Sequence, residues 1–169
     1  GVKLEATVGN FDDQTSDAEG RFEFTFDHLR YAGNGNLTAV ADGLVREKKN
    51  FEMTAGTIDL GDIVLVPGGT VTGRVQDEAG LGIADAAVFA MPHTDRRSPF
   101  AKKSDYQSLA FTRTDAKGAF VMTGVPAGFF DVWAQKQAKL SNWADGLTVE
   151  ARGETTDVEI TLSDIPENA

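Results

Sequence analysis

The fold is decided by residues 109–122, which read LAFTRTDAKGAFVM. Two short, largely apolar segments, Leu109–Arg113 and Ala119–Met122, flank an Asp-x-x-Gly turn, in which Asp115 caps the turn and Gly118 takes the left-handed conformation. Short apolar segments bounded by turn residues indicate β-strands. The stretch therefore predicts two strands joined by a hairpin turn.

The same pattern continues through the second half of the chain. Short alternating segments are separated by turn residues such as Gly, Pro and Asp. Further strands are expected at residues 70–75, 86–90, 129–134, 146–150 and 157–162. Seven short strands at this spacing predict a complete β-sandwich over residues 67–169.

The first half of the chain repeats the second half. Ser16–Phe22 aligns with Thr114–Phe120, and Leu65 falls where Leu162 falls. Two shorter matches place residues 37–39 near 132–134, and residues 2–8 against 86–91. The first copy has no counterpart of residues 70–85, so its sandwich is expected to lack the first strand and to leave a strand edge open.

The link between the copies is Val66-Pro67-Gly68-Gly69. It divides the chain into an incomplete repeat at 1–66 and a complete one at 67–169, and its shortness predicts limited freedom between them. An irregular segment at 92–108 is expected to be an insertion between two strands of the second copy.

Composition excludes several classes of function. The 169 residues carry 16 Lys and Arg against 26 Asp and Glu, a formal charge of −10, which opposes binding to nucleic acid or to an anionic bilayer. The absence of cysteine excludes disulfides, thiolate metal sites and a cysteine nucleophile. No apolar run approaches the roughly 20 residues of a membrane helix, so membrane insertion is not expected.

Several motifs of the second copy together resemble the carboxypeptidase regulatory-like domain family. They are Gly73-Arg74-Val75, Asp77–Gly80, Thr114-Asp115 with Gly118 and Phe120, Gly124–Gly128, and Gly153–Thr156 before Val158–Leu162. The resemblance implies an all-β chain of two tandem immunoglobulin-like, transthyretin-type (prealbumin-like) β-sandwiches, the first lacking its first strand. The family is similar to collagen-adhesin B-type repeats, and it supplies no catalytic residues and no cofactor.

The insertion at 92–108 carries a local positive charge in an acidic protein. Long loops on rigid sandwiches tend to carry function, and arginine and aromatic residues dominate binding hot spots. The candidate partner-binding residues are Arg96, Arg97, Phe100, Lys102, Lys103 and Tyr106. A solvated insertion without function is the alternative interpretation of this segment.

A loop at residues 139–145 offers a second candidate site. Trp143 with Asn142 and Asp145 combines an apolar ring with polar groups, as a sugar-binding site requires, although a Trp folded back over the sandwich would show the same pattern. A stacked aromatic row on one face of the protein would also favour sugar binding. Asp12, Asp13 and Asp17 resemble the composition of a calcium loop, but turn-capping carboxylates explain them better.

The sequence therefore predicts a non-catalytic structural or interaction module of a larger secreted or cell-surface protein that acts in spacing, assembly or protein binding. The expected location is bacterial and extracellular or at the cell surface, with the periplasm as the alternative. Its expected partner is a protein, through self-association or a neighbouring domain at the open strand edge. The alternative is a carbohydrate-binding accessory module of a polysaccharide-active enzyme. Most aromatic residues, including Phe89, Phe111, Phe120 and Trp133, are expected in the core, and one of Phe129 and Phe130 outside it.

Overall fold

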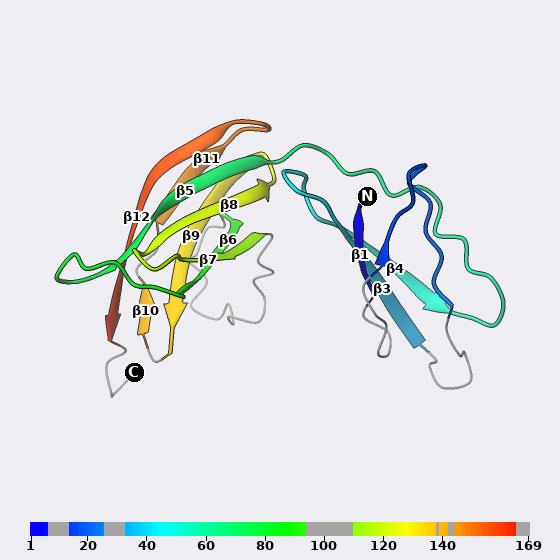
Figure 1. The fold of residues 1–169 in the computed structure, drawn as a ribbon, viewed down its shortest axis with the longest axis horizontal. Coiled ribbons are helices and arrows are strands. Elements are labelled where there is room, and N and C mark those ends of the chain that lie inside the picture. The colour runs from blue at the N-terminus through cyan, green and yellow to red at the C-terminus, as the bar shows by residue number, and fades with distance from the viewer. Residues whose placement is uncertain (7–13, 26–32, 94–109, 138, 142–143, 165–169) are drawn as a thin grey trace. The chain divides into compact units, whose positions relative to one another are not determined.

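The computed structural model describes residues 1–6, 14–25, 33–93, 110–137, 139–141 and 144–164. Every regular element in these ranges is a β-strand, which confirms the all-β fold (Figure 1). The chain separates into two compact units, Gly1–Val66 and Pro67–Ala169.

The first unit contains one four-stranded antiparallel sheet in the order β2-β1-β3-β4. Its strands are β1 (Lys3–Ala6), β2 (Gln14–Thr15), β3 (Gly33–Val40) and β4 (Glu47–Met53). Its buried core is small: Leu4, Leu37 and Ala39 form the centre, and half-buried apolar side chains pack around them.

The second unit is a larger sheet that folds over on itself. Its strands are β5 (Gly69–Asp77), β6 (Ala87–Pro92), β7 (Ala110–Arg113), β8 (Ala119–Val125), β9 (Gly128–Lys136), β10 (Lys139–Ser141), β11 (Ala144–Val149) and β12 (Glu154–Asp164). They follow the order β7-β6-β9-β10-β12-β5-β8, and β11 pairs with β9 outside this path. The short β10 joins two arms, β7-β6-β9-β11 and β12-β5-β8.

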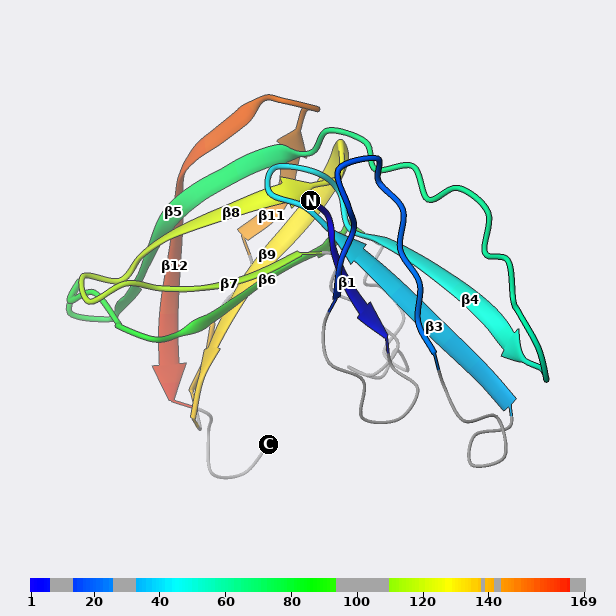
Figure 2. The ribbon, with the colours of Figure 1, turned by 45° about the vertical axis from the view of Figure 1, so that its right-hand side comes forward.

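The core of the second unit lies between these two arms. Val88 and Ala90 of β6, Val132 of β9, Val71 of β5 and Ile160 of β12 all have a relative exposure of 0%. Because both arms contribute to one apolar cluster, the second unit is a β-sandwich, as the sequence predicts. The arms can be followed in Figure 2, with β5, β8 and β12 in green, yellow-green and orange-red.

Two details of the second unit differ from the sequence prediction. Residues 139–141 form β10, so the described unit has one strand more than the seven expected. The turn at Asp115–Gly118 is not a hairpin, since β7 pairs with β6 while β8 pairs with β5. The turn links the two arms, which is a long-range property that local alternation cannot reveal.

Three Asp-x-x-Gly turns share one set of local hydrogen bonds. In each, the aspartate Oδ1 accepts the backbone N–H groups of the residues two and four positions further on, at Asp17, Asp77 and Asp115. The glycines have φ values of 82°, 80° and 82° at Gly20, Gly80 and Gly118. These turns are fixed by local chemistry, which explains why the sequence pattern locates them.

The turn at Asp115 predicts a pH dependence of stability. Hydrogen bonds from the backbone N–H groups of Lys117 and Ala119 lower the pKa of Asp115 below its ordinary value of 3.8. A lowered pKa in the folded state means that the stabilisation is complete above the unfolded-state pKa and is lost as the pH falls through the folded-state pKa. We therefore expect Asp115→Asn to flatten the loss of stability as the pH falls below the ordinary aspartate value of 3.8.

The measurement is the urea midpoint of unfolding at each pH, followed by tryptophan fluorescence, because Trp133 and Trp143 both belong to the second unit. Glu78→Gln, at an exposed position of the neighbouring Asp77 turn, is the control and should leave the acid limb unchanged. Parallel pH profiles of Asp115→Asn and the unsubstituted protein would refute the expectation.

Candidate functional site

A buried carboxylate lies close to described residues that border the two candidate segments in the sequence. Asp131 of β9 is 1% exposed, and its Oδ1 accepts hydrogen bonds from Nδ1 of His93 at 2.8 Å and from the Gly146 N–H at 2.9 Å. His93 follows β6, and Gly146 lies in β11 at a register shift between Ala144 and Leu147. Asp131 thus ties both neighbouring strands to β9 at the same level.

The residues that contact Asp131 stand next in the sequence to the segments singled out above. His93 precedes the stretch with all six candidate partner-binding residues, Arg96, Arg97, Phe100, Lys102, Lys103 and Tyr106, which lies outside the described residues. Asn142 and Trp143 also lie outside them, while Asp145 is exposed on β11 beside the register shift. Asp131 itself was missed by the sequence analysis, although a charge within the apolar run Phe129–Ala134 is a visible signal.

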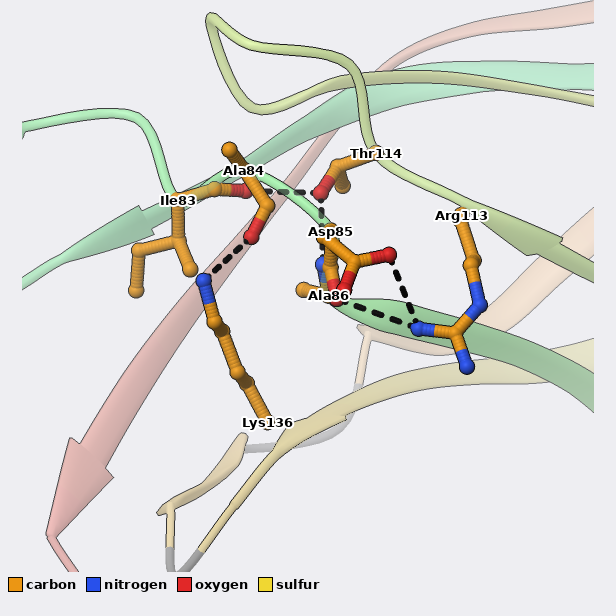
Figure 3. Close-up of polar contacts among 7 residues, drawn as sticks. All are labelled: Ile83, Ala84, Asp85, Ala86, Arg113, Thr114 and Lys136. Carbon is orange, nitrogen blue, oxygen red and sulfur yellow. Dashed lines mark hydrogen bonds and ion pairs between the residues drawn. The ribbon is translucent and has the colours of Figure 1, made fainter.

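A second polar network fixes the entry into β6 (Figure 3). Thr114 is 6% exposed; its hydroxyl accepts from the Ala86 N–H at 2.8 Å and donates to the carbonyl of Ile83 at 2.7 Å. Nζ of Lys136 donates to the carbonyl of Ala84 at 2.6 Å. These bonds satisfy backbone groups that no strand ladder pairs, so the network is structural.

An aromatic row crosses the outer face of the β7-β6-β9 arm. The ring of Phe89 lies 4.5 Å from that of Trp133 with 19° between the planes, and 5.5 Å from that of Phe111. The three residues are direct cross-strand partners. Phe111 is 50% exposed, and the other two are half-buried.

The prediction that Phe89, Phe111 and Trp133 are core residues is therefore wrong. Strand alternation fixes only that neighbours face opposite sides, and here the smaller Val88, Ala90 and Val132 face inward. Large side chains already fill that space: Phe120 and Met122 of β8 and Phe130 of β9 itself are buried, as expected for Phe120. Phe129 is 64% exposed.

The geometry of the row limits its chemistry. A sugar-binding platform presents open ring faces, but Phe89 and Trp133 stack on each other, and the guanidinium of Arg113 lies over the ring of Phe111 with Cζ 6.0 Å from the ring centroid. Several ring faces are thus already in contact with other protein groups. The row stabilises the sheet by cross-strand contacts, each worth about 0.2–1 kcal/mol.

Part of the strand pairing is the same in the two units. The first-unit order β2-β1-β3-β4 has the same pairing as β7-β6-β9-β11 in the second unit. The Val2 N–H donates to the Ser16 hydroxyl as the Ala86 N–H does to that of Thr114. By the sequence alignment, the first-unit counterparts of β8 and β12 are Arg21–Thr25 and residues 61–66. Neither segment forms a strand in the described structure, and both are drawn as coil (Figure 2).

The described residues show no group of three or more His, Cys, Asp or Glu side chains that could hold a metal ion. Asp17 caps its turn, whereas Asp12 and Asp13 lie outside the described residues. No helix in the described part is long and apolar enough to cross a membrane.

The second unit is thus an all-β sandwich without a described metal cluster. The chain belongs to the carboxypeptidase regulatory-like domain family, whose model matches residues 70–163. No curated protein matches the chain.

Solved structures give weaker likenesses. The chain is 16% identical to the TIE protein of Bacillus anthracis, covering 98% of this chain and 31% of that one with a TM-score of 0.41. It is 16% identical to a streptococcal ancillary pilin, covering 79% and 46% with a TM-score of 0.38. It is 19% identical to a 3-chlorocatechol 1,2-dioxygenase from Rhodococcus opacus, covering 59% and 62% with a TM-score of 0.37. The chain thus spans less than two thirds of each of these proteins, and scores this low carry no argument about function.

Proposed function

We propose that the chain is a non-catalytic structural and interaction module of a larger secreted or cell-surface protein, acting in assembly, spacing or protein binding. Membership of the regulatory-like family supports this, because the family resembles accessory modules rather than enzymes. The acidic charge of −10 supports a protein partner over nucleic acid.

We further propose that the first unit is a second copy of the same sandwich without its first strand. The support is the shared strand order, the shared Ser16 and Thr114 contacts, and the identical turns at Asp17 and Asp115. In the second unit, β5 lies between β8 and β12. The first unit has no described strand between the corresponding segments.

One comparison carries the interaction role. Phe120 and Leu162 of the second unit are 3% and 1% exposed, whereas their first-unit counterparts Phe22 and Leu65 are only half-buried. Apolar side chains that a complete layer would cover are therefore partly open to water. Such a layer gains stability by association with another polypeptide.

Hydrogen exchange on the intact chain tests this proposal. The amides of residues 62–66 should exchange about 100-fold or more faster than those of β12, because they lie outside any strand ladder. Amides 62–66 as protected as those of β12 in a monomeric protein would show a closed first unit and refute the role of this edge.

A carbohydrate-binding accessory module is the second candidate, favoured by the stacked row of Phe111, Phe89 and Trp133 and by the exposed Asp145. The ring-on-ring stacking supports it less than open ring faces would. Trp133→Ala with unchanged retention on immobilised polysaccharides would remove this support.

A further inference from the structure

We propose that the first unit accepts an extended polypeptide strand between Arg21–Thr25 and residues 61–66, antiparallel to the first segment and parallel to the second. This inference rests on the proposed function and names the partner's chemistry: a strand with apolar residues at its third and seventh positions and glycine at its fifth. Its model is β5, Gly69–Asp77, which is antiparallel to β8 and parallel to β12.

The two flanking segments already have the alternation of strands. Phe22 and Phe24 are half-buried between the exposed Arg21, Glu23 and Thr25. In the second segment, Ile63 and Leu65 are half-buried between exposed neighbours, and Val64 is 72% exposed. All four half-buried side chains pack against the buried centre of Leu4, Leu37 and Ala39. Each segment thus has one face on the core, as a strand of a second layer would.

The burial of matching residues shows what is missing. Phe120, Met122, Ile160 and Leu162 of the second unit are 3%, 1%, 0% and 1% exposed. Their first-unit counterparts by the repeat are Phe22, Phe24, Ile63 and Leu65, which are all half-buried. In the second unit the inward Val71 and Val75 of β5, each 0% exposed, belong to the cluster that covers these side chains. An inserted strand with the same two apolar residues would cover their counterparts.

The register follows from a glycine of β5. Gly73 is the Cα partner of Phe120, and a Cβ added to Gly73 would lie against the carbonyl oxygen of Val158 and 2.8 Å from Cζ of Phe120. Phe22 takes the place of Phe120 in the first unit, so the inserted strand needs glycine opposite Phe22. A side chain at that position would meet the phenylalanine ring.

Charge on the outer face of the proposed site favours one substitution in the inserted strand. Thr72 is the Cα partner of Val121, whose first-unit counterpart is the exposed Glu23. The exposed Asp62 on the other flank matches Glu159, the Cα partner of Arg74, so the arginine that β5 carries already suits that position. A lysine at the donor position that matches Thr72 is therefore preferred over threonine, since it meets a carboxylate instead of an apolar side chain.

A second copy of this chain is not the expected occupant. The described segment with the required pattern is β5 itself, which lies between β12 and β8 of its own unit. Its withdrawal would expose Val71 and Val75 to water and open the sandwich. The occupant is therefore a strand supplied from outside residues 1–169.

The test uses the intact chain and a synthetic nine-residue peptide with the sequence of Gly69–Asp77. We expect saturable binding at one peptide per chain, and exchange of amides 62–66 about tenfold or more slower, with the amides of β8 and β12 unchanged. A peptide with valine at its fifth position, in place of the glycine that matches Gly73, should bind at least about tenfold more weakly. A peptide with lysine in place of the threonine that matches Thr72 should bind more tightly.

Three outcomes would overturn the inference. The first is equal binding of the glycine and valine peptides. The second is peptide-induced protection of the amides of β8 and β12 instead of residues 62–66. The third is protection of residues 62–66 by dimerisation of the chain without any peptide. Each leaves the proposed function standing if residues 62–66 exchange rapidly in the monomer. Slow exchange in the monomer without peptide would instead refute the open layer itself.

Discussion

Gly118→Ala is expected to destabilise the second unit by about 2–5 kcal/mol. Gly118 has a φ of 82°, a conformation that L-residues disfavour by about 1–2 kcal/mol. A Cβ at this position would also lie against the carbonyl oxygen of Val75, 2.7 Å from the amide nitrogen of Ile83 and 2.8 Å from the Cα of Gly82. These are backbone atoms at the point where one arm meets the other, so they cannot move aside without disturbing β5.

Gly80→Ala provides a matched control in the same kind of turn. Gly80 has a φ of 80°, and a Cβ there would meet nothing within 4 Å. Its substitution should therefore show the conformational penalty alone, about 1–2 kcal/mol. Urea unfolding followed by tryptophan fluorescence measures both variants, and equal losses for the two would contradict the role of packing at Gly118.

Asp131→Ala is expected to lower the free energy of unfolding of the second unit by about 2–4 kcal/mol. The substitution leaves the Gly146 N–H without its carboxylate acceptor, and it opens a cavity beside β9. Asp131→Asn keeps an oxygen that can accept from Gly146 and should lose less. His93→Ala should also lose less, since the His93 side chain is 46% exposed and water can replace it.

Chemical denaturation of the three variants measures this order. Hydrogen exchange adds a local readout, because loss of the Asp131 contact should speed exchange at Gly146 before it affects β5. An Asp131→Ala protein as stable as His93→Ala would show that the buried carboxylate does not hold the two neighbouring strands together.

Local chemistry made much of the fold predictable. The Asp-x-x-Gly turns were located from sequence because each aspartate bonds to the backbone of its own turn, with Asp115 as the example. The strands from β5 to β12, apart from β10, were located because the residue pattern of a strand is also a local property of the chain. Ser16 and Thr114, which align in the sequence, also make matching contacts in the two units, although their partners Val2 and Ala86 lie 14 and 28 residues away.

The candidate site was less predictable. Asp131 acts through residues 38 positions before it and 15 positions after it, His93 and Gly146, so no spacing rule points to it. The residues chosen from the sequence lie in segments that the structure does not describe, apart from Asp145, and their roles stay predictions.

The sequence by itself determined where strands and turns lie, because these depend on alternation, on the left-handed preference of glycine and on side-chain caps within a few residues. Only the tertiary structure decided which strands pair. It placed β5 parallel to β12, separated β7 from β8, and turned Phe89 and Trp133 outward. A strand's two faces are equivalent until a partner layer buries one of them, and that choice depends on the volume already filled by residues distant in the chain.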